Sequence, residues 1–277
     1  MKLQYTIMIV LVAMWLMPID LAQHVYAIEG PSFEKIQKLA ERGDANAQFM
    51  VGERYRNGEG VAQDWVTAAT WYRKAADSEH ARAQYYLALM VDKGLGVQKN
   101  PREALILYRK AAEQGHVDAQ FNLGMVYRDG SDAPRDYPEA MQWFLRAADQ
   151  GDAGAQNALG VMFQYGHGAP QDMKKAVQWF RKAADQGLLL GQLNLASLYA
   201  VGDGIPQDFL AAEKWFRKAA EQGDMEAQYF LGSMYLEGRG VPQDLEEAFK
   251  WNRKAADQGH REAQQFMSTF DSLLNRQ

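Results

Sequence analysis

The chain contains no cysteine. This absence excludes disulfide bonds, thiolate zinc sites, cysteine nucleophiles and lipid attachment through a cysteine, although it leaves the cellular compartment open. An excess of basic residues is also missing, because 30 lysines and arginines face 35 aspartates and glutamates, for a net charge of −5. The basic side chains are spread along the chain rather than gathered in a patch. We therefore expect no nucleic-acid partner.

The N-terminal region lacks an apolar run of the length, about 20 residues, that an ordinary transmembrane helix needs. Its run from Thr6 to Met17 has 12 residues, and Lys2 is the one charge before it. The segment VYA at 25–27 then offers small residues to a signal peptidase. We expect residues 1–27 to be a cleaved signal peptide, so that an exported chain, periplasmic or secreted, begins at Ile28 without stable membrane insertion. An uncleaved membrane anchor is the alternative.

What the chain does contain is a sequence motif close to R-K-A-A-E-Q-G, which occurs six times at a spacing of 36 residues. The copies begin at Arg73, Arg109, Leu145, Arg181, Arg217 and Arg253. A catalytic site is usually built once. A motif repeated at fixed spacing therefore indicates a structural repeat.

The first half of each period predicts an amphipathic helix. In the second period, Ala83, Leu87, Ala88 and Val91 follow the spacing i, i+4, i+5 and i+8, which marks one helical face. The small residues on that face allow another helix to approach closely. A glycine, Gly94 in this period, is expected to end the helix, because glycine tolerates the left-handed conformation found just past a helix end.

The second half predicts another helix, which begins at a polar N-cap: Asn100 in the second period and aspartate in the others. An alanine, a tryptophan and a pair of alanines then share one stripe, although Leu107 replaces the tryptophan in the second period. The tryptophan column favours core packing because it recurs in register with the small residues; a ligand-binding box is the alternative. In the third period Asp132 stands where the others have a second turn glycine, which predicts a different turn there.

A helix-turn-helix unit of this size cannot bury its own apolar faces, so the units must stack. We predict an all-α fold, an α/α superhelical solenoid with a period of 36 residues and six repeats over residues 45–260. Residues 28–44 are expected to form an N-terminal capping half-repeat, and residues 261–277 a C-terminal capping helix.

Three segments of the period carry a family resemblance: A-x-x-x-L-G-x-x-Y, then G-x-G-V-x-x-D, then A-x-x-W-[YF]-R-K-A-A-[ED]-Q-G. Together they resemble the Sel1-like repeat, a relative of the tetratricopeptide repeat, over residues 45–260. Asn252 departs from the pattern by replacing an aromatic residue in the sixth unit. The resemblance implies a solenoid that acts as an adaptor or scaffold. It also implies an exported bacterial protein with a role in host interaction, signalling control or envelope assembly.

Residues that the repeat does not explain are the place to look for chemistry, and they form no group of acids, bases and nucleophiles. We therefore expect a protein that is not an enzyme and has no catalytic residue, cofactor or metal. His80, His116 and His260 share the column that leads into the next unit. The varied residue types of that column favour an exposed loop, and a weak metal site along the same edge is the alternative.

Columns that vary between copies point to a binding surface, because the packing stripe does not constrain them. Two neighbouring columns of the first helix carry large apolar side chains that can anchor a protein or peptide on the concave face. The candidates are Phe49, Met50, Tyr85, Tyr86, Phe121, Tyr229 and Phe230. Packing against the neighbouring unit is the alternative for these columns.

Leu188 and Leu190 are further candidates, because other copies carry a polar residue near this junction. Exposed leucines would form a patch for a partner or a dimer, whereas a modified joint would bury them. The expected protein is a monomer or weak dimer that binds a protein or peptide whose identity the sequence does not indicate. A cell-wall or glycan-associated factor that supports envelope enzymes is the alternative function.

Overall fold

The computed structural model describes residues 32–274 of the chain, and the predicted signal peptide lies outside this range. The described part contains fourteen α-helices and no strand. In chain order they are α3 (Phe33–Glu41), α4 (Ala45–Asn57), α5 (Trp65–Asp77), α6 (Ala81–Lys93), α7 (Pro101–Glu113), α8 (Val117–Asp129), α9 (Tyr137–Asp149), α10 (Ala153–Tyr165), α11 (Met173–Asp185), α12 (Leu189–Val201), α13 (Phe209–Glu221), α14 (Met225–Glu237), α15 (Leu245–Asp257) and α16 (Arg261–Leu274).

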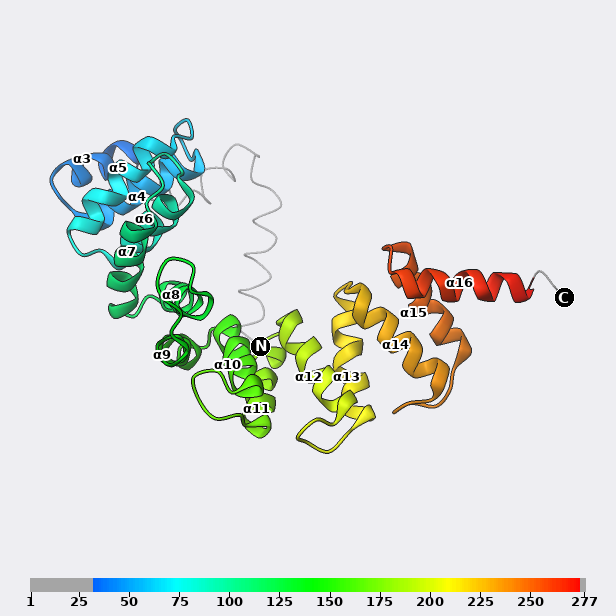
Figure 1. Ribbon diagram of the computed structural model, residues 1–277. Helices are drawn as coiled ribbons and strands as arrows, with labels where there is room; N and C mark the ends of the chain where they lie inside the picture. Colours follow the sequence, from blue (N-terminus) through cyan, green and yellow to red (C-terminus); the bar gives the residue numbers. More distant parts are fainter. Residues whose placement is uncertain (1–31, 275–277) are drawn as a thin grey trace, which may run out of the picture.

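The helices form a curved stack in which each helix packs against the next along the chain (Figure 1). Along the arc, α8 and α10 lie on the inner side, while α9 and α11 lie on the outer side. The first helices of the repeats therefore line the concave face and the second helices line the convex face. The predicted all-α solenoid is confirmed. Within the described residues, no helix combines the length and apolar character that crossing a bilayer requires.

The ends of the helices follow the chemistry of their capping residues. Each first helix from α4 to α14 ends at a glycine in the left-handed region, with φ between 70° and 75°. Each second helix from α5 to α15 begins at the aspartate or asparagine expected from the sequence, whose side chain accepts a backbone N–H of the first turn. Asp132 lacks the positive φ of the glycines that take its place in the other units, so the predicted difference in the third turn is confirmed.

In the first five units, the core is built where an aromatic ring of the second helix lies on a small residue of the first helix; Asn252 takes the place of the ring in the sixth unit. A Cβ placed on Gly160 would lie 2.5 Å from Cδ1 of Phe180, and one on Gly124 would lie 2.7 Å from Cδ1 of Phe144. These rings are fully buried. The tryptophan one position earlier is buried or half-buried, and a basic side chain three residues later covers its ring, as Lys218 covers Trp215 at 4.2 Å. Core packing is therefore confirmed for the tryptophan column.

A ladder of glutamines joins the units. The invariant glutamine of each first helix is buried and donates its amide N–H to the carbonyl of an alanine eight residues earlier, as Gln120 does to Ala112 at 3.0 Å. Its own Oε1 accepts an N–H from Nε2 of the glutamine that ends the second helix of the same unit, as in the 2.8 Å bond from Gln150 to Gln120. The same bond recurs in four other units, from Gln114, Gln186, Gln222 and Gln258.

The ladder is broken in the first unit, at its joint with the second. Ser78 stands where the other units have the donating glutamine, and Oε1 of the buried Gln48 has no hydrogen-bond partner. Glu79 stands where the others have glycine and is the one non-glycine residue with positive φ, 59°, in the described chain. Both irregularities destabilise this joint relative to the others, because they leave a buried acceptor unpaired and force a side chain into the left-handed region.

Candidate protein-binding surface

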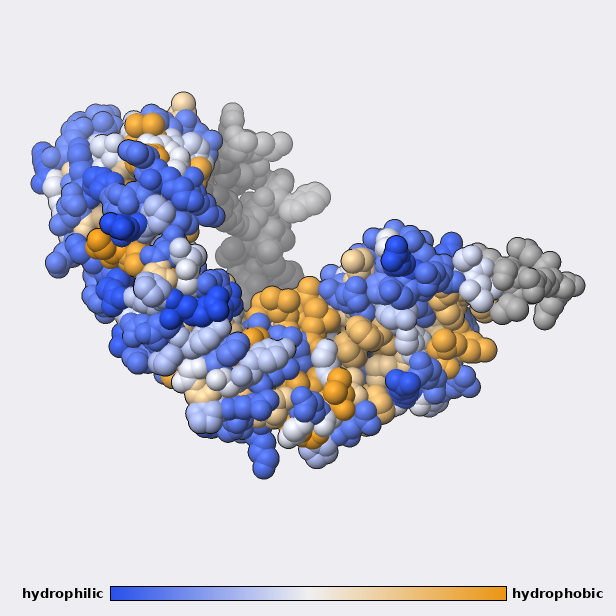
Figure 2. Space-filling view, in the orientation of Figure 1, coloured by the Kyte–Doolittle hydropathy of each residue, from blue (hydrophilic) through white to orange (hydrophobic). Residues whose placement is uncertain are grey.

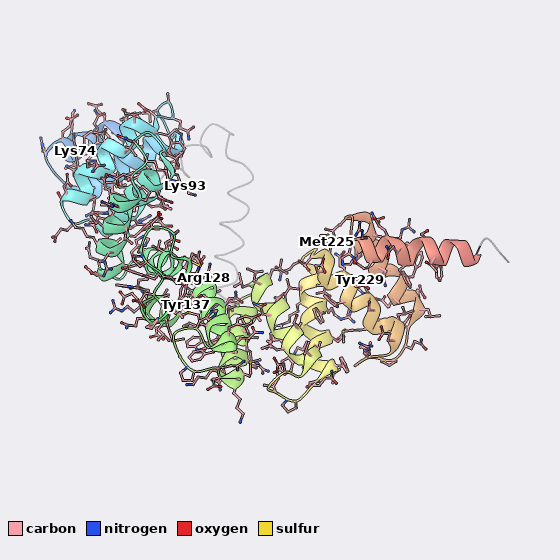
Figure 3. All side chains as sticks on the ribbon, viewed as in Figure 1. Lys74, Lys93, Arg128, Tyr137, Met225 and Tyr229 are labelled. Carbon is pink, nitrogen blue, oxygen red and sulfur yellow. The ribbon has the colours of Figure 1, made fainter. Side chains whose placement is uncertain are left out.

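The concave face changes character along the arc. Helices α10 and α12 contain no Asp, Glu, Lys or Arg, whereas each of the other first helices from α4 to α14 contains at least two charged residues. Lys93 and Arg128, near the ends of α6 and α8, are examples of the charges that α10 and α12 lack (Figure 3). Figure 2 shows hydrophobic surface on the inner side of the arc at α12. Two adjacent units thus present a continuous uncharged stretch.

Three large side chains of this stretch are exposed. Tyr165 at the end of α10 is 63% exposed, and Val201 and Leu190 of α12 are 69% and 58% exposed. The position of Tyr165 and Val201 is held in the second and third units by Lys93 and Asp129. We call α10 and α12, with these three side chains, the apolar saddle. Exposed apolar area that is not interrupted by charge favours association, because covering it releases water without desolvating an ion.

The first predicted column, Phe49, Tyr85, Phe121 and Tyr229, packs between neighbouring units. Phe49 is 5% exposed and stacks on His80, the N-cap of α6, which is the next unit's first helix, with 4.8 Å between the ring centroids. Tyr85 and Tyr229 are half-buried and stack in the same way on His116 and His260, at 4.5 Å and 4.3 Å. Phe121 is half-buried against Phe144, at 5.8 Å. The expectation that Phe49 is a surface anchor is wrong, because the next unit covers its ring.

The second predicted column is more open. Met50 and Phe230 are exposed, and Phe230 stacks on Phe216 at 5.2 Å, which leaves its outer edge free. Tyr86 is half-buried, because its ring lies on Tyr72 at 5.7 Å and the guanidinium of Arg56 lies over it at 4.3 Å. These side chains come from α4, α6 and α14, at the two ends of the arc rather than at its middle. The structure therefore does not bring the predicted aromatic residues together into one site.

The predicted leucine pair divides between two environments. Leu188 is the N-cap residue of α12, half-buried, and makes no side-chain capping bond. Leu190 is exposed on the apolar saddle, whereas Leu189 packs against the core. Both alternatives are therefore incomplete: the leucines are not all buried in a modified joint, and they do not all form an exposed patch.

The histidine column is the N-cap column of the first helices and not an exposed loop. Nδ1 of His80 accepts the backbone N–H of Ala83 at 3.1 Å, and His116 caps α8 in the same way. His260 is buried, so the expectation of exposure is wrong there because the stacked Tyr229 ring and α16 cover it. Burial holds the pKa of His80 and of His116 below its ordinary value; nearby Arg82 adds to the shift of His80, while Asp118 opposes that of His116.

No group of three side chains suited to hold a metal ion occurs within residues 32–270. The acidic and basic groups form separate pairs spread along the solenoid, as Arg73 does with Glu103 at 2.7 Å and Arg56 with Glu53 at 3.0 Å. The described side chains thus form surfaces that can bind a partner and contacts that hold neighbouring units together. Sequence reasoning missed the apolar saddle, although its signal was present in the two charge-free segments 153–165 and 189–201.

The comparisons with known proteins agree with this architecture. The model of the Sel1 repeat matches six consecutive segments of the chain, residues 45–80, 81–116, 117–152, 153–188, 189–224 and 226–260. The chain belongs to the Sel1 repeat family. Sel1 repeat proteins are generally protein-interaction scaffolds. No curated protein sequence matches the chain.

Two solved Sel1 repeat structures are similar to it. One is a protective antigen present in uropathogenic Escherichia coli strains, which displays an SLR fold; it is 35% identical over 85% of this chain, with a TM-score of 0.82. This chain spans half, 50%, of the length of that antigen. The other is a Sel1 repeat protein from Oxalobacter formigenes, 36% identical over 77% of this chain and 85% of its own, with a TM-score of 0.68.

Proposed function

We propose that this Sel1 repeat protein is an exported, non-enzymatic scaffold that binds a protein or peptide partner on its concave face. The observation that carries the proposal is the apolar saddle, the uncharged stretch formed by α10 and α12 in the middle of the arc. The similarity to a protective antigen of uropathogenic Escherichia coli and the signal-like residues 1–27 support the exported setting.

The saddle suits a partner segment with apolar side chains. A partner that lies along the inside of the arc covers Leu190 and Val201 without displacing a charge, while charged residues of α8 and α14 lie on either side. Such a charged rim around an uncharged centre is the usual arrangement of specific protein interfaces. Met50 and Phe230 are additional anchors for a partner long enough to reach the ends of the arc.

The test uses substitutions that other units already carry at the same positions. Leu190→Arg copies Arg82, and Val201→Lys copies Lys93, so both are compatible with a first helix. The matched control is Ile106→Lys on α7, which copies Lys214 and changes a residue that is also 58% exposed but lies on a second helix. A photo-crosslinking residue at Tyr165 reports which protein of the producing cell contacts the saddle.

We expect the wild type and the Ile106→Lys variant to give the same crosslinked partner, and the two saddle variants to lose it while they keep the wild-type thermal midpoint. Unchanged crosslinking in the saddle variants contradicts binding at this surface. The exported setting is tested separately by N-terminal sequencing of protein from the periplasmic and extracellular fractions. A chain that still begins at Met1 rejects cleavage of the signal peptide.

A further inference from the structure

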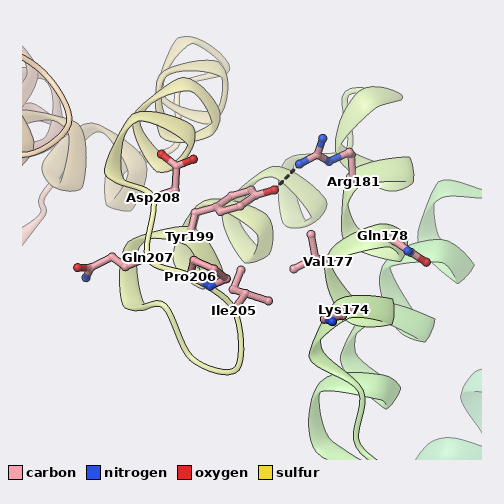
Figure 4. Close-up of a pocket in the computed structure, with 9 residues that line it drawn as sticks. All are labelled: Lys174, Val177, Gln178, Arg181, Tyr199, Ile205, Pro206, Gln207 and Asp208. Atoms are coloured by element: carbon pink, nitrogen blue, oxygen red, sulfur yellow. Dashed lines mark hydrogen bonds between the residues drawn. The ribbon is translucent and has the colours of Figure 1, made fainter.

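A groove of about 670 Å³ lies on a different side of the solenoid, between α11 and the segment 202–208 that follows α12 (Figure 4). Val177 and Ile205 form apolar walls that pack against the core, and the exposed Pro206 extends this surface outward. Figure 4 shows Lys174 and Arg181 on the α11 side, with the apolar side chains between them and the loop. The volume is in the range, about 300–1,000 Å³, of grooves that hold ligands or peptide side chains.

Three counterparts of this groove's arginine, Arg181, form ion pairs, whereas Arg253 of the sixth unit, like Arg181, forms none in the described chain. Arg73 pairs with Glu103 at 2.7 Å, Arg109 with Glu139 at 3.9 Å, and Arg217 with Glu213 at 2.5 Å. Arg181 donates to the hydroxyl of Tyr199, a bond that Arg109 and Arg217 also make to the equivalent tyrosines. In the described chain, however, no carboxylate lies within ion-pair distance of Arg181.

The missing carboxylate has a specific cause in the sequence. Glu103 and Glu139 each stand 30 residues after the arginine that they pair with, and the residue 30 positions after Arg181 is Ala211. Lys174 likewise has no ion-pair partner in the part of the chain that the structure describes. The two cations beside the apolar walls are thus left for an external anion.

One carboxylate, that of Asp208, lines the groove, and it is already engaged. It is the N-cap of α13 and accepts the backbone N–H of Ala211 at 2.9 Å. In Figure 4 it lies on the far side of Tyr199 from Lys174. Two cations and one capping carboxylate give the groove a formal charge of +1 from Lys174, Arg181 and Asp208.

We infer that this groove binds an acidic peptide segment in which a carboxylate stands next to an aliphatic side chain. The carboxylate pairs with Arg181, whose planar guanidinium can donate two parallel hydrogen bonds, and Lys174 holds a second acidic group. The aliphatic side chain lies between Val177 and Ile205. Because the groove is on the side of α11, this docking surface is separate from the apolar saddle and does not depend on the proposed function.

Fluorescence anisotropy with three labelled octapeptides tests the charge requirement on the folded protein. The peptides alternate Leu with Asp, Leu with Asn, and Leu with Lys. We expect binding of the Asp peptide alone, weakened by added salt. Arg181→Gln should weaken it about tenfold or more, the loss expected for a hydrogen bond between charged groups. Arg73→Gln, in the equivalent groove of the first joint, is the matched control and should leave the affinity unchanged.

A second variant tests the groove without altering its walls. Ala211→Glu places a carboxylate where Glu103 and Glu139 stand, so that it pairs with Arg181 internally and competes with the peptide. We expect this variant to keep the wild-type thermal midpoint, or exceed it, and to lose binding of the Asp peptide. No binding of the Asp peptide up to millimolar concentration, equal binding of the Asn peptide, or full binding by Arg181→Gln or Ala211→Glu overturns the inference.

Discussion

The broken glutamine ladder makes a quantitative prediction: restoring it should stabilise the protein. The perturbation is Ser78→Gln together with Glu79→Gly, which gives the first joint the residues found at the others. The introduced glutamine side chain is then placed to donate to Oε1 of Gln48, a buried acceptor that now has no partner. Glycine at position 79 removes the one side chain that the described backbone holds at positive φ, 59°.

The two effects have separate magnitudes. Satisfying a buried acceptor with a neutral hydrogen bond contributes about 1 kcal/mol. Relieving a non-glycine residue in the left-handed region contributes about another 1 kcal/mol. The glycines at the equivalent turns have φ between 86° and 98°, so the substituted turn adopts a conformation the fold already uses. The expected gain for the double variant is about 2 kcal/mol, and because the residues are adjacent the two contributions need not add fully.

Urea unfolding followed by circular dichroism measures this gain, with hydrogen exchange to locate it. Since a solenoid is stabilised by nearest-neighbour contacts, added protection should appear mainly in α4, α5 and α6. Ser78→Ala is the control that cannot form the bond. Gln150→Ser makes the opposite change at an intact joint, by removing the donor to Gln120 and to the carbonyl of Gly115, and should cost at least about 1 kcal/mol. If Gln150→Ser is destabilising and Ser78→Gln brings no gain, the unpaired oxygen is not the cause of the weakness.

Three further predictions concern residues that depart from the repeat. Leu188→Asp supplies the missing N-cap of α12 and should raise stability by about 1 kcal/mol, seen as a higher thermal midpoint; an unchanged midpoint would show that the cap is not limiting. Oδ1 of the buried Asn252 has no hydrogen-bond partner, and Asn252→Phe introduces the kind of aromatic residue that the other units have at this position. The free energy of unfolding, measured in urea, should rise by about 1–2 kcal/mol. A lower value would show that the site cannot accommodate the ring. Burial lowers the pKa of His80 and His116 in the folded state, so the unfolded chain binds more protons as the pH falls through and below 6.5, and stability present above that pH should be lost on acidification. Asparagine can cap a helix without titrating. The double variant His80→Asn with His116→Asn should therefore show a smaller change of the urea midpoint between neutral and mildly acidic pH. An equally steep pH profile in that double variant would refute the assignment.

Much of the architecture was determined by the sequence alone. Capping and helical periodicity act over a few residues, so the ends of α7, with Asn100 before it and Pro101 at its first position, follow from local chemistry. Because the same local chemistry recurs every 36 residues, it also specifies the stacking of the solenoid.

The tertiary structure alone decided which variable columns remain exposed. Phe49 and Met50 are adjacent in sequence and similar in hydrophobicity, yet the ring of His80, at the start of α6, covers Phe49 and leaves Met50 exposed. That choice depends on how far one unit rotates against the next, and no local pattern encodes the rotation. The unpaired charge of Arg181 also depends on stacking. Position 211, the equivalent of Glu103 that pairs with Arg73, lies 30 residues away from Arg181 in sequence and becomes its neighbour only when the units stack.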